Sequence, residues 1–242
     1  TNLSLQVAIT GILAVGMTMV IITGGIDLSV GTVMTFSAVM TGVFITNMHL
    51  PIPIGILGGI LAGSTAGLVN GLMISRMKIP PFIATLGMLY ATKGLSLVIS
   101  ELKPIYFNDT PAFREMAMGS IFGKIITGFN IPNAVLVLFG AAIIASLILS
   151  RTILGRYTYA LGSNEEATRL SGVNVASWKT AVYTLCGFFA GLALIPVYAF
   201  YFLLEKRAIT DNWASYLPLQ ASWAKDELTF VIRAINDHLI AF

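Results

Sequence analysis

Hydrophobic residues in this chain form long runs that are separated by short polar breaks. A helix that spans a membrane needs roughly 20 consecutive, mostly apolar residues. Six runs reach or approach that length, at residues 3–23, 30–48, 52–75, 80–99, 133–150 and 180–203. The pattern therefore predicts an all-α, polytopic membrane protein with about six transmembrane helices.

The composition agrees with that prediction. Of 242 residues, 56% are hydrophobic and 10% are charged, and the mean hydropathy is +0.85. Soluble domains carry about 25% charged residues, so this chain has too few charges to cover a wetted surface. The net charge of +3 is spread through the loops and gives no reason to expect nucleic acid as a partner. The single cysteine, Cys186, excludes a disulfide within the chain and is expected to be a small apolar residue inside a helix.

Basic residues indicate the orientation of the helices. Arg76 and Lys78 lie in the gap after the third run, and four further basic residues lie in the gap 151–179. Both gaps fall on the same side by parity, and the excess of Lys and Arg predicts that this side is cytoplasmic. The gap 100–132 then falls outside.

The third run carries a glycine at every fourth residue. The five positions are Gly55, Gly59, Gly63, Gly67 and Gly71. Residues at i and i+4 share one face of a helix. Small residues on one face let a neighbouring helix approach closely within a membrane, so this run is expected to be a packing scaffold. In the last run, Pro196 is expected to kink the helix because it removes an intrahelical hydrogen bond.

The stretch TGGIDLSVG, residues 23–31, holds the only charged side chain of the first 75 residues, Asp27. Gly24 and Gly25 are expected to end the first helix. One interpretation is that Asp27 or Ser29 caps the second helix, where free N–H groups favour a carboxylate. The other is that Asp27 lines a substrate route or gate together with Gly24, Gly25, Ser29 and Gly31, because a carboxylate at membrane depth needs a local purpose. A cap can also shape a gate, so the two interpretations are compatible.

The stretch GSNEEATRLSGVNV in the gap 151–179 predicts a short helix over about 164–171. Ser163 and Glu166 have the S-x-x-E spacing of a capping box. Glutamates fall in the first turn and Arg169 near the end, as the helix dipole favours, and Gly172 is placed to end the helix. Ala167, Leu170 and Val173 would give this helix a small apolar side.

Three stretches together resemble the permease subunits of ribose-type ABC sugar importers. They are VGMTMVIITGGIDLSVGTVMTFSAVMTG, IPPFIATLGMLYATKG and LGRYTYALGSNEEATRLSGVNVASWKTAVYTLCGFFAGLA. The resemblance runs from about residue 3 to about 193, which is some four-fifths of the chain. It implies a multi-pass protein of the bacterial cytoplasmic (inner) membrane, in contact with lipid, that forms a translocation pathway for ribose or a related small sugar.

The resemblance also implies partners and sites. In such importers a short cytoplasmic coupling helix docks on a separate ABC ATPase subunit, a periplasmic sugar-binding protein delivers the substrate, and a second permease copy completes a homodimer. Glu166, Ala167 and Gly172 match the signature of that helix. The residues expected to form the ATPase-coupling site are Asn164, Glu165, Glu166, Ala167, Arg169 and Gly172.

Lys93 is the other charge within an apolar run, in the later part of residues 80–99. Its long side chain can extend to the outer interface, or it can line a sugar-accessible cavity and belong to the substrate pathway. The sequence leaves both interpretations open.

Motifs for chemistry within the chain are missing from the sequence. There is no G-x-x-x-x-G-K-[ST] phosphate loop, no His/Cys metal set and no nucleophile–base pair at a telling spacing. We therefore predict no catalytic residues, no metal and no cofactor in this chain. ATP would be bound by a partner subunit, and the chain would be a transport subunit rather than an enzyme.

The end of the chain differs from the rest. Residues 1–203 are interpreted as the transmembrane permease region, and residues 204–242 as a polar tail with nine charges between Glu205 and Asp237. Apolar residues recur at helical spacing over 228–239, which predicts an amphipathic helix there.

Relatives implied by the resemblance have one more spanning helix before residue 1 and further membrane segments after the sixth run, so the chain is expected to be truncated at both ends. An alternative function is then a transport-inactive permease fragment. A stand-alone secondary transporter ranks lower, because Asp27 and Lys93 are the only charges inside the apolar segments.

Overall fold

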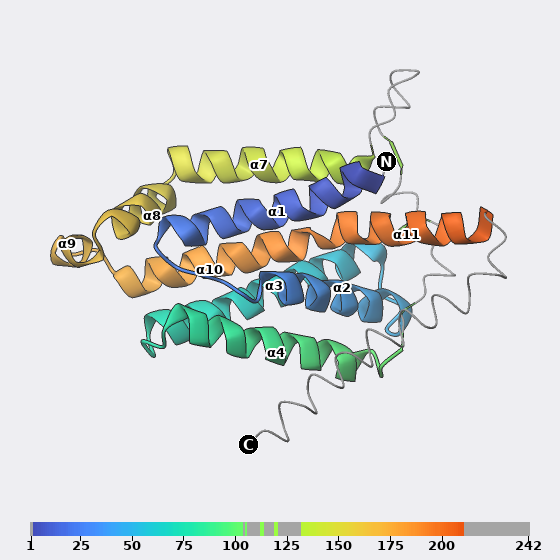
Figure 1. Ribbon diagram of the computed structural model, residues 1–242, viewed down its shortest axis with the longest axis horizontal. Helices are drawn as coiled ribbons and strands as arrows, with labels where there is room; N and C mark the ends of the chain where they lie inside the picture. Colours follow the sequence, from blue (N-terminus) through green and yellow to red (C-terminus); the bar gives the residue numbers. More distant parts are fainter. Residues whose placement is uncertain (1, 104, 106–111, 114–118, 121–131, 211–242) are drawn as a thin grey trace. The chain divides into compact units, whose positions relative to one another are not determined.

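The computed structural model describes residues 2–103, 105, 112–113, 119–120 and 132–210, and these form helices joined by short connections, with no strand among them (Figure 1). The helices and their bounds are α1 (Asn2–Ile22), α2 (Val30–Thr46), α3 (Ile52–Ser75), α4 (Pro81–Ile99), α7 (Asn133–Arg151), α8 (Ile153–Ser163), α9 (Glu165–Leu170), α10 (Val175–Leu192) and α11 (Leu194–Thr210).

The chain divides into two compact units, residues 1–200 and residues 201–242. The first unit holds α1 to α10 and the first turns of α11. In the second unit, the described residues 201–210 continue as helix, and the rings of Tyr201 and Phe202 meet edge to face at 5.6 Å. The amphipathic helix that the sequence predicts over 228–239 lies outside the described residues.

Each of the six apolar runs is helical, which confirms the all-α, polytopic membrane class. Five helical stretches of the described chain are long and apolar enough to span a membrane: Leu3–Ile22, Ile52–Ser75, Pro81–Ile99, Asn133–Arg151 and Val175–Phe202. The remaining run, residues 30–48, forms α2, which is apolar but only 17 residues long. Large apolar side chains point outward along several spans, for example Leu57 and Leu61 on α3 and Ile143 and Leu147 on α7. Such outward apolar faces suit a lipid surrounding.

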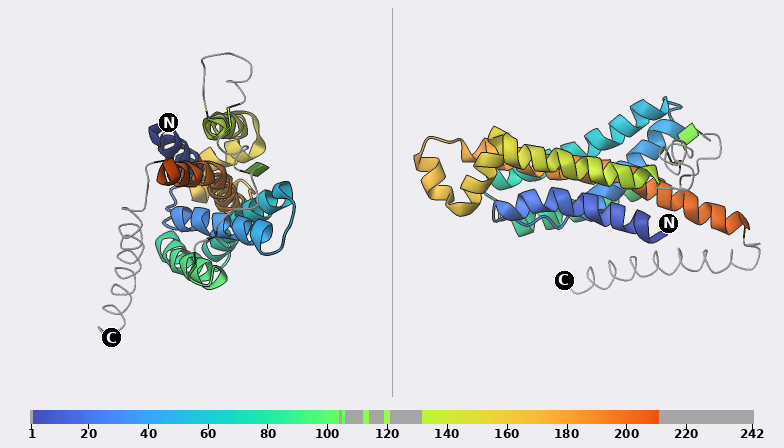
Figure 2. Two further views of the ribbon diagram at one scale, coloured as in Figure 1. Left: turned by 90° about the vertical axis from the view of Figure 1, so that its right-hand side faces the viewer. Right: turned by 90° about the horizontal axis from the view of Figure 1, so that it is seen from above.

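The glycine face of α3 packs closely against other helices, as the sequence predicts: Gly55 and Gly59 lie against α2, and Gly63, Gly67 and Gly71 lie against α10. A Cβ added at Gly63 would lie 2.6 Å from the carbonyl oxygen of Gly187, and one at Gly67 would lie 2.3 Å from that of Tyr183. The approach is reciprocal, because a Cβ added at Gly191 of α10 would lie 2.9 Å from the Cα of Ile60. Backbone therefore meets backbone along this interface, and no larger side chain fits between the two helices. Figure 2 gives two further views of the helices in this unit.

The last apolar run is two helices rather than one, because α10 ends at Leu192 and α11 begins at Leu194. Pro196 explains the break: it has no N–H to donate to the carbonyl of Leu192, four residues earlier. Cys186 lies in the middle of α10 and is fully buried in the core, as expected for a small apolar residue.

Candidate functional site

The connection between α1 and α2, residues 23–29, is called here the Asp27 loop. α1 ends at Ile22, and Gly24 adopts a φ of +74°, a left-handed conformation that residues with a Cβ rarely take. Gly25 has a different reason to be glycine, since an added Cβ would lie 2.5 Å from the hydroxyl of Tyr183 on α10. The Tyr183 hydroxyl donates a hydrogen bond to the carbonyl of Ile26 at 3.4 Å. The loop is therefore fitted closely against α10.

Asp27 is buried, with 4% of its surface exposed, and belongs to a polar chain that crosses to α3. Its Oδ1 accepts hydrogen bonds from the backbone N–H of Ser29 at 2.8 Å and from the Ser29 hydroxyl at 2.6 Å. The Ser29 Oγ accepts in turn from the side-chain amide of Asn70 at 2.9 Å. The carboxylate thus holds the loop closed on itself, and Ser29 joins it to α3.

The prediction that Asp27 or Ser29 caps α2 needs correction. Ser29 occupies the N-cap position, but its side chain makes no capping hydrogen bond with the described residues. Asp27 bonds the N–H of the N-cap residue itself and does not reach the first turn of the helix. The physical reason is that Asn70 lies beside the Ser29 hydroxyl and draws it toward α3.

Burial sets the electrostatics of this loop. Removal of the Asp27 carboxylate from water raises its pKa above the usual range, while the two hydrogen bonds from Ser29 act in the opposite direction. Desolvation is the larger of these effects. The charge on Asp27 therefore responds to pH over a higher range than that of an exposed aspartate.

The short helix predicted from GSNEEATRLSGVNV is α9, Glu165–Leu170, but its cap differs from the prediction. Asn164 is extended (φ −158°, ψ 102°), and its side-chain oxygen accepts a hydrogen bond from the N–H of Ala167 at 2.9 Å. Ser163 cannot form the predicted capping box because it is still the last residue of α8. Gly172 follows the end of the helix with a φ of +82°, which confirms it as the residue that ends α9.

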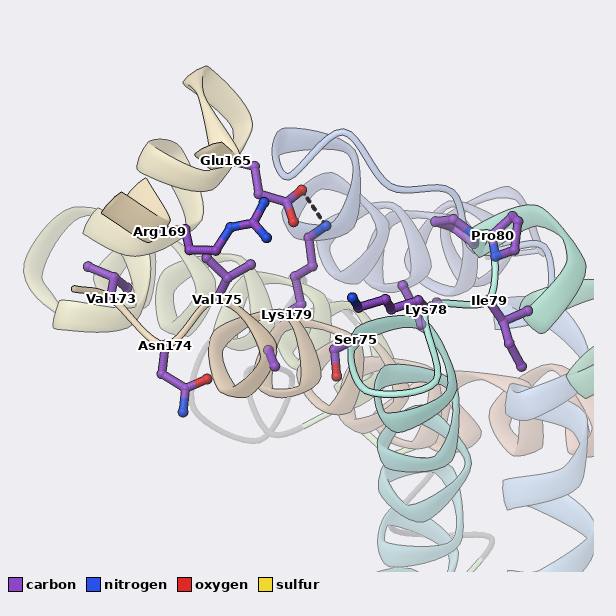
Figure 3. A pocket seen from close by; sticks show the side chains of 13 residues that line it. Ser75, Lys78, Ile79, Pro80, Glu165, Arg169, Val173, Asn174, Val175 and Lys179 are labelled. Atoms are coloured by element: carbon purple, nitrogen blue, oxygen red, sulfur yellow. Dashed lines mark hydrogen bonds and ion pairs between the residues drawn. The ribbon is translucent and has the colours of Figure 1, made fainter. Parts of the chain in front are cut away.

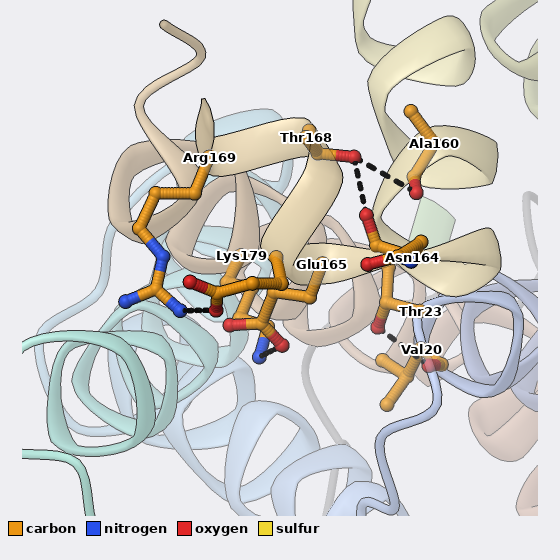
Figure 4. Close-up of polar contacts among 9 residues, drawn as sticks. Val20, Thr23, Ala160, Asn164, Glu165, Thr168, Arg169 and Lys179 are labelled. Carbon is orange, nitrogen blue, oxygen red and sulfur yellow. Dashed lines mark hydrogen bonds and ion pairs between the residues drawn. The ribbon is translucent and has the colours of Figure 1, made fainter. Parts of the chain in front are cut away.

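Side-chain contacts hold α9 to its neighbours (Figure 4). The Thr168 hydroxyl donates to the carbonyl of Ala160 on α8 at 3.0 Å. The Lys179 ammonium on α10 donates to the Glu165 carboxylate at 2.5 Å. A third contact, the ion pair of Arg169 with Glu166, lies within α9 itself. These contacts place α9 as a small, defined projection at one end of the bundle.

A pocket of about 650 Å³ lies between this projection and the connection from α3 to α4 (Figure 3). Its charged lining residues are Lys78, Glu165, Arg169 and Lys179. The two basic gaps of the sequence therefore meet at one end of the molecule, as their parity predicts. The Asp27 loop begins at the same end. It follows Ile22, and Gly162 of α8 lies so close to the Ile22 carbonyl that a Cβ added at Gly162 would clash with it.

Comparison with known proteins decides the family. A model of the permease component of branched-chain amino acid transport systems matches residues 1–215. The chain belongs to this permease family. No solved structure matches it.

Related permeases named for sugars match most of the chain. The fructose import permease of Rhizobium meliloti is 38% identical over 194 residues, which is 78% of this chain and 52% of the relative. The ribose import permease of Escherichia coli K12 is 36% identical over 194 residues, or 79% of this chain and 58% of the relative. The L-arabinose ABC transporter permease of Azospirillum brasilense is 34% identical over 198 residues, or 79% and 54%. These matches confirm the resemblance to ribose-type ABC sugar permeases, although the chain spans about half the length of the curated relatives it matches.

Two of the predicted pathway residues, Gly31 and Lys93, lie outside the Asp27 loop. Gly31 lies in the first turn of α2, where an added Cβ would meet no described atom within 4 Å. Lys93 lies on α4, partly exposed, next to Thr92, whose hydroxyl donates to the Thr32 hydroxyl at 2.9 Å. The role of Lys93 stays a prediction, since nothing in these contacts decides between the interface and a cavity.

Three residues that the sequence did not single out as site residues contact the predicted ones. Asn70 bonds Ser29, Tyr183 bonds the backbone of Ile26, and Lys179 bonds Glu165. A signal existed for Asn70, because an amide inside the apolar run 52–75 is unusual there. Lys179 was visible only as a charge that helps set orientation.

Proposed function

We propose that this chain is the transmembrane subunit of an ATP-driven importer for ribose or a related small sugar. Its membership of the permease family and the names of its relatives support this proposal. Those relatives are named for ribose, fructose, L-arabinose and galactofuranose, so the common substrate class is a small monosaccharide. The chain would need no covalent chemistry, only two conformations whose balance an external motor shifts.

The proposed motor is a separate ABC ATPase subunit that docks on α9, with the end of the bundle that bears α9 facing the cytoplasm of a bacterial inner membrane. A periplasmic sugar-binding protein and a second permease copy are the other proposed partners. In this arrangement ATP is bound and hydrolysed by the ATPase subunit, and the permease supplies the path.

The single observation that supports this docking best is the exposure of Leu170. It is 82% exposed on a helix that lies outside the membrane-spanning stretches. A leucine exposed to water offers apolar area that a partner can bury favourably. Two acidic residues and Arg169 surround it on α9, so the surface offers a small apolar contact with a charged rim.

The Asp27 loop is the proposed gate. Its buried carboxylate and its two glycines hold a non-helical connection next to α10 and α3. Non-helical backbone near membrane depth needs protein around it. Since the loop packs on two helices, a relative movement of either helix would change its conformation.

ATP-dependent uptake of labelled ribose, fructose and arabinose into vesicles tests the proposal. The vesicles would contain the permease, its ATPase subunit and its binding protein. We expect Leu170→Ala to reduce uptake by about fivefold or more, as truncation of a central interface residue does. Leu102→Ala is the matched control, because Leu102 is also an exposed leucine (65%) but follows α4, away from α9.

Docking itself is measured by crosslinking a cysteine placed at the exposed position Ala167 to the ATPase subunit. A crosslink that forms with the intact chain and weakens in Leu170→Ala would support the assignment of α9. Uptake and crosslinking that are unchanged in Leu170→Ala, in Glu166→Gln and in Gly172→Ala would refute it.

A further inference from the structure

The contact between Lys179 and Glu165 differs from the other ion pairs of the described chain, because it joins two helices and is partly shielded. The side chains of Lys179 and Glu165 are 21% and 44% exposed, whereas those of Arg169 and Glu166 are 58% and 66% exposed. The Arg169–Glu166 pair also lies within α9 and connects it to nothing else. An exposed pair of that kind contributes little, while shielding from water strengthens an ion pair.

The pair fixes the orientation of α9 relative to α10. The C-terminal end of α9 is tied to α10 by the short connection 171–174. Glu165 is the first residue of α9, so the ion pair ties its N-terminal end to α10 as well. While this pair is formed, a helix held at both ends pivots less about the connection, and a force on α9 passes into α10.

The next residue along α10 makes the contact with α3. The Thr180 hydroxyl lies 2.8 Å from that of Ser75, and a Cβ added at Gly71 would lie 2.7 Å from the Thr180 Cα. The backbones of α10 and α3 therefore touch directly beside Lys179. A displacement of this part of α10 must displace this part of α3, because close-packed backbones cannot interpenetrate.

The residue before Gly71 reaches the Asp27 loop. Asn70 donates to the Ser29 hydroxyl, which donates to Asp27. One turn further along α10, Tyr183 contacts the same loop at the carbonyl of Ile26. The physical path from α9 to the buried carboxylate thus consists of the ion pair Lys179–Glu165, the backbone contact between Thr180 and Gly71, and the two hydrogen bonds that join Asn70 to Ser29 and Ser29 to Asp27.

We propose that Lys179 is a positioning residue that transmits movement of α9 to the Asp27 loop through its ion pair with Glu165. The proposal rests on the proposed function, and it adds a residue and a route that the importer would use. Lys179 touches no substrate. It acts by keeping α9 aligned with the α10–α3 contact.

The test uses the whole importer in vesicles, with a cysteine at Ile26 as a reporter in the Asp27 loop. Ile26 is 48% exposed, while Cys186 is fully buried and stays silent toward a maleimide. The first measurement is the change in maleimide labelling of Ile26→Cys when ATP and vanadate are added. The second is the crosslink from Ala167→Cys to the ATPase subunit, which reports docking alone.

We expect Lys179→Gln to reduce the nucleotide-dependent change in labelling by about five- to tenfold, which falls within the range of coupling between contacting residues. The Ala167 crosslink should stay at the level of the intact chain. Lys179→Arg should keep the response, and the exchange of charges in Glu165→Lys with Lys179→Glu should restore it. The unchanged Ala167 crosslink separates positioning from a general loss of folding, and the restoration shows that the effect depends on the ion pair itself.

Lys103→Gln is the matched control, because Lys103 also forms an ion pair with a glutamate, Glu101. Both residues lie just after α4, and their side chains are 74% and 75% exposed. A full labelling response in Lys179→Gln, or a charge exchange that docks without restoring the response, would overturn the proposal. Absence of the crosslink in the chain that carries Ala167→Cys with Lys179 and Glu165 unchanged would instead refute the proposed function, so the two failures are distinguishable.

Discussion

The α3–α10 interface and the attachment of α9 hold parts of the same unit together by opposite means. Between α3 and α10, glycines on both helices bring backbone against backbone, and an added Cβ would lie within 3 Å of the opposite helix at several positions. At α9, a few long or polar side chains make the connections, namely Thr168, Glu165 and Lys179.

This difference separates a rigid element from an adjustable one. Close backbone packing has one arrangement, because a small shift along the interface produces clashes. Ion pairs and hydrogen bonds between partly exposed side chains form and break at little net free energy. We expect substitutions to affect stability strongly at the first region, and to affect communication between helices more than stability at the second.

The largest loss of stability is expected from Gly67→Ala on α3. The new methyl group would meet the Tyr183 carbonyl at 2.3 Å, so α3 and α10 must separate. Overpacking of this kind destabilises by about 1–3 kcal/mol, measured as the free energy of unfolding in detergent. Gly87→Ala on α4 is the control, because it meets no described atom within 4 Å and should be neutral or stabilising. Equal effects of the two substitutions would contradict the packing argument.

A smaller loss is expected from Asp27→Ala. It removes the acceptor of two hydrogen bonds and leaves the Ser29 N–H buried without that partner, which should lower the free energy of unfolding by about 1–2 kcal/mol. Asp27→Asn keeps an acceptor oxygen and should lose less. If the asparagine variant is as unstable as the alanine variant, the hydrogen bonds are not what holds the loop.

The raised pKa of Asp27 predicts that the free energy of unfolding depends on pH, and that this dependence differs between the unsubstituted chain and Asp27→Asn. Because burial raises this pKa in the folded chain, the folded state binds more protons than the unfolded state between the ordinary value of 3.8 and the raised value. The free energy of unfolding therefore falls as pH rises through that window. Thermal unfolding measured across it should show this slope in the unsubstituted chain and a weaker slope in Asp27→Asn.

At α9, Asn164→Ala is expected to weaken the helix locally by about 1 kcal/mol, since it removes the N-cap. Hydrogen exchange of the Ala167 amide, which Asn164 caps, would measure the effect. Ser163→Ala is the control and should leave exchange unchanged, because Ser163 belongs to α8. A larger effect of Ser163→Ala than of Asn164→Ala would instead support the capping box that the sequence predicts.

The smallest effect is expected from Arg169→Gln. The ion pair of Arg169 with Glu166 is exposed and lies within one short helix, so its loss should change the free energy of unfolding by less than about 0.5 kcal/mol. Added salt should reduce the difference further. A larger change in the free energy of unfolding would mean that Arg169 also stabilises the chain through contacts in the pocket that it lines together with Lys78.

The sequence predicted the elements of this fold well because long apolar runs leave little choice. A backbone in lipid must satisfy its own hydrogen bonds, so each run of sufficient length becomes a helix. Gly24 and Gly172 were correctly placed at helix ends, since both take a positive φ that glycine permits. The S-x-x-E motif misled at Ser163 because local spacing cannot show that α8 continues to that residue.

The polar partners were less predictable. Asn70 and Ser29 are 41 residues apart, and Glu165 and Lys179 are 14 apart. The first contact joins α3 to the Asp27 loop and the second joins α9 to α10, so each depends on how separate elements pack. The periodic glycines indicate which face of α3 packs, but they do not name the helix that packs on it.

By itself, the amino-acid sequence determined the helical class, the positions of the spans, the packing face of α3 and the short helix near residue 166, because each follows from local periodicity and chain geometry. Tertiary structure alone decided that α10 is the partner of α3, that Asp27 is bonded to Ser29 rather than to α2, and that Lys179 reaches α9. The physical reason is that each of these outcomes depends on which side chains of separate elements meet when the helices pack, and local periodicity does not specify that.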